Sequence, residues 1–302
     1  PDPSSTALRE TVAARYGVKP EQVFAGNGSD EVLAFAFGAF FFSLSRALLF
    51  PDITYSFYPV YADLWGIPFK KIPLCEDFSI NCDDYKPPAI NCSGVIFPNP
   101  NAPTGIPVPL ADILLLAEHL EGQGRALVVD EAYIAFGAQS AVPYIEKHPN
   151  LLTVHTLSKQ MALAGLRVGF AVGSEELIEG LYRIKDSFNS YPLDRLAMAG
   201  AAAAISDFAY YDDKNSKVIA TRERVAQELR ALGCTVLPSA ANFLFIKAHN
   251  ISGIDFFTGL RERGILVRHF DNPRISDYLR VSIGTDNEMD AFLTECKNIV
   301  GR

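Results

Sequence analysis

The chain has 302 residues, of which 49% are hydrophobic and 21% charged, and its formal net charge is −8. This composition is typical of a globular protein with room for two domains, and an acidic chain without a basic block disfavours nucleic acid or an anionic membrane as partner. The five cysteines form no CxxC pair, so neither a disulfide framework nor a metal site is indicated, and the cytoplasm is the expected compartment.

Apolar runs and helix-forming stretches alternate along the first two thirds of the chain. The expected strands are 22–25, 47–50, 69–74, 94–97, 125–129, 151–157 and 169–172, and the expected helices are 4–17, 31–42, 109–120 and a long helical region at 174–209. Such alternation with continuous apolar strands predicts an α/β fold, in which helices sandwich a mostly parallel sheet. Ligands of such sheets bind beyond the carboxyl ends of the strands.

A smaller α+β domain is expected to follow. Its pattern predicts helices at 216–232, 253–263 and 286–299, and strands near 234–237, 243–247, 265–268 and 278–283. We therefore expect a large ligand-binding domain over residues 1–190 and a small, substrate-closing domain over residues 191–302.

A glycine-containing turn, Gly26-Asn27-Gly28-Ser29-Asp30, lies between the first expected strand and the next helix. Exposed backbone N–H groups at a helix start would hold an anion, although a simple capped turn is the alternative interpretation. Because an Asp30 carboxylate would repel a phosphate, we expect Asp30 to cap the helix and to offer its backbone N–H. The spacing does not fit a dinucleotide fingerprint, since Glu31 stands where the third glycine belongs.

Two further polar clusters follow expected strands. Asp130 comes after Ala-Leu-Val-Val, and a magnesium role there would need a GxxxxGK[ST] phosphate loop, which the sequence does not contain. Asp130 could instead pair with a protonated ring nitrogen, with Tyr133 in reach of an oxygen on the same ring. Lys159 follows another strand end and is either an ordinary surface lysine or an amine kept for chemistry.

Several side chains complete a possible ligand site. Thr156 and Ser158 offer hydroxyl groups and Arg167 a bidentate cation for a phosphate, while Tyr55 could stack on an aromatic ring. Together these groups describe a flat phosphorylated pyridine that bears an aldehyde. The amine of Lys159 would form a Schiff base with that aldehyde.

The order of the motifs NGSDE, TYSFY, NPNAPTG, DEAY and TLSK…LAGLRVGF resembles the fold-type-I pyridoxal-phosphate aminotransferases, most nearly the histidinol-phosphate aminotransferase family. The resemblance implies that pyridoxal 5'-phosphate is the cofactor and that Lys159 carries it and moves the proton. It also implies that Asp130 pairs with the pyridine nitrogen, Tyr133 with the ring hydroxyl, and Tyr55 with the ring face. Around the phosphate it implies Gly28, Ser29, Asp30, Ser158 and Arg167, with Thr156 nearby.

The family commonly has an asparagine directly before Pro-Thr-Gly, where this chain has Ala102, and we expect Asn101 to replace it. In the second domain, Arg280 matches the family arginine for a substrate carboxylate, and Arg268 one for the phosphate of histidinol phosphate. Asn242 is expected at the edge of the same site. Taken singly, these arginines would read as surface ion-pair residues.

The expected function is transamination of histidinol phosphate with 2-oxoglutarate, in histidine biosynthesis, by a homodimer. An aromatic or broad-range aminotransferase and a threonine-phosphate decarboxylase-like enzyme are the nearer alternatives. A pyridoxal-phosphate-sensing regulator is disfavoured because such proteins usually add a basic DNA-binding module, and none is evident in this sequence. The missing lysine loop disfavours a nucleotide hydrolase.

Overall fold

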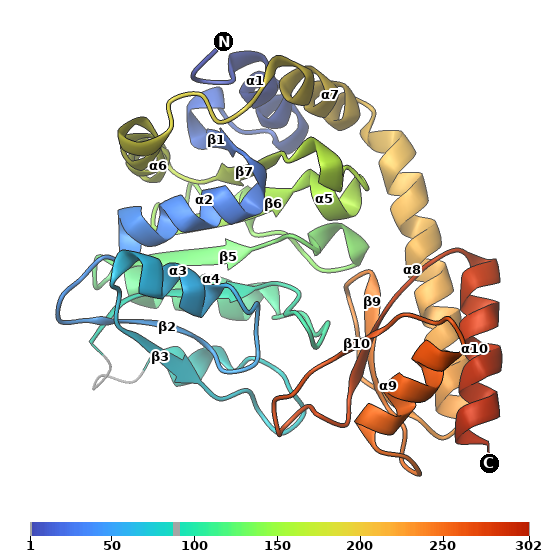
Figure 1. The fold of residues 1–302 in the computed structure, drawn as a ribbon. Coiled ribbons are helices and arrows are strands. Elements are labelled where there is room, and N and C mark those ends of the chain that lie inside the picture. The colour runs from blue at the N-terminus through green and yellow to red at the C-terminus, as the bar shows by residue number, and fades with distance from the viewer. Residues whose placement is uncertain (1, 87–90, 302) are drawn as a thin grey trace.

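A seven-stranded sheet organises the first part of the chain in the computed structural model, which describes residues 2–86 and 91–301 (Figure 1). Its strand order is β1-β7-β6-β5-β4-β2-β3. The strands are β1 (Val23–Gly26), β2 (Ala47–Pro51), β3 (Phe69–Ile72), β4 (Cys92–Pro98), β5 (Ala126–Asp130), β6 (Leu151–Thr156) and β7 (Gly169–Val172). Strands β3, β2, β4, β5 and β6 run parallel, and β7 pairs antiparallel with both neighbours. The predicted mostly parallel sheet is thereby confirmed.

Helices cover both faces of this sheet, as the alternation of side chains along each strand requires. Val128 packs with α2 (Gly28–Ala36), α3 (Tyr58–Trp65) and α6 (Glu175–Phe188) on one face. Its neighbours Leu127 and Val129 pack on the other face, where α4 (Leu110–Glu121) lies. Towards the β1 edge, α1 (Thr6–Tyr16) and α7 (Arg195–Ser206) continue the cover of that second face.

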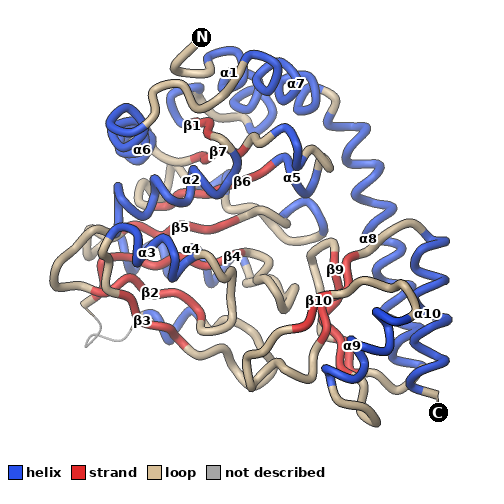
Figure 2. The backbone as a smooth tube through the Cα atoms, in the orientation of Figure 1, coloured by secondary structure: helices blue, strands red, loops and turns tan. Residues whose placement is uncertain are grey.

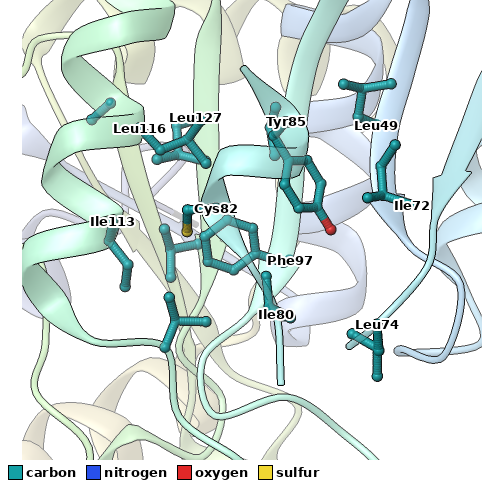
Figure 3. Packing of buried hydrophobic residues seen from close by; sticks show 14 of the residues in the cluster. Leu49, Ile72, Leu74, Ile80, Cys82, Tyr85, Phe97, Ile113, Leu116 and Leu127 are labelled. Carbon is teal, nitrogen blue, oxygen red and sulfur yellow. The ribbon is translucent and has the colours of Figure 1, made fainter. Parts of the chain in front are cut away.

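Figure 3 shows the core beneath α4. Phe97 and Leu127 from the sheet meet Ile113 and Leu116 of the helix, and Ile72 of the edge strand β3 turns towards the same core. All five side chains are buried, and burial of large apolar side chains contributes roughly 1.5–3 kcal/mol each. This packing sets the face that each residue of β3 presents.

Three of the expected helical stretches have other bounds in the structure. The helix expected at 31–42 begins earlier, as α2 (Gly28–Ala36), and continues as a π-helical turn, Phe37–Phe41. The long region 174–209 is two helices, because Pro192 lies between α6 and α7 and the Asp194 carboxylate accepts the N–H groups of Leu196 and Ala197 to start α7. The next helix, α8 (Phe208–Ala231), begins eight residues before the expected position 216.

The C-terminal part is a four-stranded antiparallel sheet with helices (Figure 2). It contains β8 (Thr235–Val236), β9 (Phe243–Lys247), β10 (Arg268–His269), β11 (Leu279–Ser282), α9 (Gly253–Glu262) and α10 (Asp286–Val300). Helix α8 runs alongside this unit in Figure 1, whereas Ala197 and Ala201 of α7 pack with Leu8 and Val12 of α1. The division at residue 190 stays a prediction. Among the helices of the described residues, none is long and apolar enough to cross a bilayer.

Candidate active site

Nine of the predicted site residues line one cavity of about 170 Å³ at the carboxyl ends of β5 and β6. They are Ser29, Asp30, Tyr55, Asp130, Tyr133, Thr156, Ser158, Lys159 and Arg167. The parallel pairing of β5 with β6 brings the ends of these strands to one edge, so residues far apart in sequence meet there. Pro98, Ala102, Ala132 and Ala164 supply the rest of the lining.

Lys159 lies on the short helix α5 (Leu157–Gln160), which starts directly after β6. The Thr156 hydroxyl oxygen begins this helix by accepting the backbone N–H of Ser158 at 3.1 Å. The Lys159 Nζ atom lies 5.6 Å from the centre of the Tyr133 ring, and no carboxylate of the described residues comes within 4.0 Å of it. The amine is therefore available to a ligand rather than held in an ion pair.

Asp130 ends β5 with its carboxylate on the α3 face of the sheet. One oxygen accepts the Tyr58 hydroxyl at 3.1 Å, and the other accepts the backbone N–H of Ala132 at 3.2 Å. Burial raises the pKa of Asp130 to about 6, and these two hydrogen bonds oppose that rise by favouring the ionised form. A buried acceptor of this kind suits a cationic ring N–H.

Tyr58 was not identified from the sequence as a site residue, since the sequence predicts no helix in this segment. The structure makes Tyr58 the first residue of α3, and burial raises the pKa of its phenol, with the charge of Asp130 adding to the rise. The spacing of Tyr55, Tyr58 and Tyr61 is a signal that could have been used, since residues three apart share a helix face.

An anion cradle forms where α2 starts. Gly28 has a φ of +81°, and a Cβ atom there would lie 2.5 Å from Nη2 of Arg167, so only glycine allows the guanidinium this close. A Cβ atom on Gly169 would overlap the backbone of Gly28 and Ser29. The first N–H groups of α2, the Ser29 hydroxyl and Arg167 thus converge where a phosphate would be stabilised.

Asp30 differs from its expected role as a cap. It is the third residue of α2, and one carboxylate oxygen accepts the hydroxyls of Tyr55 at 2.8 Å and Tyr61 at 3.2 Å. Its other oxygen lies 3.5 Å from Nη2 of Arg167. The side chain therefore orients Tyr55 and Arg167, and the helix start at Gly28 explains why it is not free to cap.

Asn101 does not line the cavity. Its side chain is fully buried, and the amide group donates to the carbonyl of Ile53 at 3.0 Å and to the hydroxyl of Thr104 at 3.1 Å. Ala102 occupies the cavity wall beside it. The expected contact of Asn101 with a cofactor ring has no support in this arrangement, because the amide already donates to Ile53, in the segment after β2, and to Thr104 in its own loop.

A second cavity, of about 380 Å³, adjoins the first, since Tyr55 and Ala102 line both. Arg268 and Arg280 project into it from the C-terminal sheet, while Asn242 lines neither cavity. Phe243 links the two cavities. Its ring packs edge-on against Tyr133, with 5.1 Å between the ring centroids, and the Arg280 guanidinium lies 5.2 Å from the centroid of the same Phe243 ring.

The donor set fits a phosphorylated pyridine aldehyde. It offers an unpaired amine, a buried acceptor for a ring N–H, an aromatic face and a cradle that glycines keep open. Within residues 2–86 and 91–301, no cluster of three His, Cys, Asp or Glu side chains could hold a metal ion.

Comparison with known proteins agrees with this site. The sequence profile of "Aminotransferase class I and II" matches residues 1–295. The histidinol-phosphate aminotransferase of Aromatoleum aromaticum is 52% identical over 302 residues, which is 99% of this chain and 84% of that protein.

Two solved structures share the fold. The histidinol-phosphate aminotransferase of Clostridium acetobutylicum has a TM-score of 0.91 at 23% identity, covering 100% of this chain and 90% of that one. The Sinorhizobium meliloti enzyme in complex with pyridoxal-5'-phosphate has a TM-score of 0.88 at 21% identity, covering 100% and 82%. The chain belongs to the class I and II aminotransferases and, within them, to the histidinol-phosphate aminotransferase family.

Proposed function

We propose that this chain binds pyridoxal 5'-phosphate in the first cavity and transfers the amino group of histidinol phosphate to 2-oxoglutarate, as a step of histidine biosynthesis. The observation that carries the proposal is the meeting of the unpaired Lys159 amine, the buried Asp130 carboxylate and the anion cradle in one cavity. When bound, the coenzyme would supply an electrophilic carbon for amines and a ring that takes up an electron pair.

The chain's own residues would do the rest. Lys159 would hold the coenzyme covalently, and its freed amine would remove the proton from the substrate carbon that bears the amino group. Asp130 would accept the ring N–H, and Tyr133, which lines the same cavity, would donate to the ring hydroxyl. The phosphate would be held by Gly28, Ser29, Ser158 and Arg167, and Tyr55 would cover one face of the ring.

The second cavity would bind the charged ends of both substrates. Arg280 suits the carboxylate of the amino acceptor and Arg268 the phosphate of histidinol phosphate, since guanidinium groups bind both anions in a bidentate manner. The Phe243 ring, packed between Tyr133 and Arg280, couples this cavity to the coenzyme site.

Lys159→Ala tests the chemistry, with the exposed Lys147→Ala as its matched control. We expect the Lys159 variant to lose turnover by at least the 10²–10⁴-fold of a typical general base, together with the absorption band of the covalently held coenzyme, and the control to keep both. Full activity in the Lys159 variant would refute the mechanism.

A substrate panel tests the specificity. We expect kcat/KM with histidinol phosphate to exceed that with phenylalanine or with threonine phosphate. A preference for phenylalanine would instead favour a broad-range aminotransferase, and release of carbon dioxide from threonine phosphate would favour a decarboxylase.

A homodimer is part of the proposal. Phe57, Val60 and Leu64 follow one face of α3 beside the cavity and are 46%, 50% and 71% exposed. Their placement favours a second copy of the chain as the occupant of this face. Light scattering of the wild type should give twice the mass of one chain. Leu64→Glu should lower the measured mass towards that of a single chain. A wild-type protein that is monomeric and fully active would contradict the proposed homodimer.

The cytoplasm is the proposed compartment, because all five cysteines are free thiols in the structure. We expect thiol titration of the denatured protein, isolated from cells, to find five reactive thiols. A disulfide would contradict the assignment to the cytoplasm.

A further inference from the structure

Two arginines of the second cavity face each other, and no carboxylate of the described residues serves as their counter-ion. Arg268 on β10 pairs directly with Arg280 on β11, and like charges opposite each other weaken a sheet. Neither guanidinium has a carboxylate within 4.0 Å in the part of the chain that the structure describes. The Phe270 ring lies 5.8 Å from one guanidinium and 6.0 Å from the other. An anion bound between the two cations would relieve this repulsion.

A third cation reaches the same cavity from the other side. Lys71 lies on the edge strand β3, where Ile72 turns into the core beneath α4 (Figure 3), so Lys71 points to the opposite face. It is adjacent in register to Phe50 of β2, and both line the second cavity. Lys71 also has no acidic partner among the described residues.

The acid in this lining is already neutralised. Asp52 holds the Arg274 guanidinium at 2.9 Å with one oxygen and the backbone N–H of Leu74 at 2.9 Å with the other. Among residues 2–86 and 91–301, the three cations Lys71, Arg268 and Arg280 thus have no acidic partner, although the net charge of the chain is −8. Such a concentration of positive charge selects a ligand that carries more than one negative charge.

We propose that Lys71 is a specificity residue that binds the phosphate group of the amino-donor substrate from the large-domain side. A phosphate monoester carries about −1.5 to −2 charges at pH 7, so a third cation favours it over a carboxylate or an uncharged side chain. The lysine comes from the seven-stranded sheet and the arginines from the four-stranded one, so a bound phosphate also joins the two units. The inference rests on the proposed function, because it assigns the substrate's phosphate to this cavity.

The test compares Lys71→Met with Lys70→Met, the neighbouring lysine on the same strand and the opposite face, outside the cavity lining. We expect Lys71→Met to raise the KM for histidinol phosphate about tenfold, the loss expected for one charge-assisted hydrogen bond, with kcat changed less than twofold. The KM for phenylalanine should not change. Lys70→Met should match the wild type, and Lys71→Arg should restore most of the affinity.

A binding measurement separates this inference from the proposed function. With the coenzyme loaded, inorganic phosphate should raise the unfolding midpoint of the wild type and of Lys70→Met. It should raise the unfolding midpoint of Lys71→Met by less. If the wild type does not convert histidinol phosphate, the proposed function fails while this phosphate measurement still tests Lys71. If the wild type does convert it and Lys71→Met equals Lys70→Met in KM and in the phosphate shift, the inference alone is overturned. An equal rise of KM for phenylalanine would overturn it as well.

Discussion

The Tyr58 hydroxyl donates a 3.1 Å hydrogen bond to the Asp130 carboxylate, and both side chains are almost fully buried. The bond joins the start of α3 to the end of β5, so it fixes the direction of the acceptor that the coenzyme ring would meet. It also favours the ionised carboxylate against the effect of burial.

Tyr58→Phe should weaken pyridoxal-phosphate binding about tenfold. A hydrogen bond to a charged group is worth roughly 1.5–3 kcal/mol, and because the coenzyme-free protein also loses this bond, only part of that free energy is lost from binding. The loss of affinity should grow as the pH is lowered, because Asp130 protonates more readily without the Tyr58 hydrogen bond. Equilibrium titration of the coenzyme at several pH values measures this. Tyr85→Phe, which removes a hydroxyl group from the core beneath α4, should leave the affinity unchanged, and equal losses in the two variants would contradict the positioning role of Tyr58.

Asp130 should make the coenzyme-free protein less stable as the pH rises. Burial raises its pKa from 3.8 to about 6 in the folded chain, so its contribution is fully present below pH 3.8 and is lost as the pH passes through about 6. Compared with Asp130→Asn, the wild type should lose on the order of 3 kcal/mol of unfolding free energy between pH 4 and pH 7.

Denaturant unfolding of both proteins across this pH range measures that difference. Glu131 and His155 titrate in both proteins, so their contributions to the pH dependence largely cancel in the difference between the two. Bound pyridoxal phosphate should suppress the decline, because a cationic ring N–H beside Asp130 lowers the pKa of the carboxyl. A difference that stays flat with pH in the coenzyme-free proteins would show that Asp130 is not held in the protonated form.

Gly169→Ala should damage the anion cradle. The added methyl group would overlap the backbone N of Ser29, and the resulting shift at the start of α2 should cost about 1–3 kcal/mol of stability and at least tenfold in coenzyme affinity. Gly165→Ala is the matched control, since its methyl group would meet nothing within 4 Å. Thermal unfolding with and without coenzyme measures both effects, and unchanged affinity in Gly169→Ala would argue against a phosphate at this place.

Arg222 should be needed for the attachment of the C-terminal unit. Its buried guanidinium donates to the carbonyls of Phe136 at 2.7 Å and Ala241 at 2.8 Å, which lie in the segments that carry Tyr133 and Phe243. Arg222→Met leaves two buried acceptors unpaired, at about 1–3 kcal/mol each.

Arg224→Met is the control for this substitution, because Arg224 on the same helix makes half-exposed ion pairs with Glu228, Asp286 and Asp290. Such surface pairs contribute about 0–1 kcal/mol. Urea unfolding should therefore separate the two variants clearly, and similar losses would show that the buried carbonyls are satisfied in another way.

Strand ends and their polar residues could be read from the sequence alone. The continuous apolar runs before Asp130 and Lys159 marked buried parallel strands, and the carboxyl ends of such strands lie at one edge of the sheet. The meeting of Lys159, Asp130 and Tyr133 in one cavity follows from that rule, whereas Arg167 precedes the antiparallel strand β7 and is brought there by the fold. The roles of all four towards a coenzyme stay predictions until the variants are measured.

Partners across elements were decided only by the tertiary structure. The sequence determined that a polar group would follow each of these strands, because backbone pairing and side-chain alternation act over a few residues. It did not determine that Tyr58 would meet Asp130, that Asp30 would bind Tyr55 instead of capping α2, that the Asn101 amide would turn inward, or that Lys71 would join Arg268 and Arg280. Those contacts depend on how whole helices and sheets pack, and packing is set by side-chain shapes that are distant in the chain.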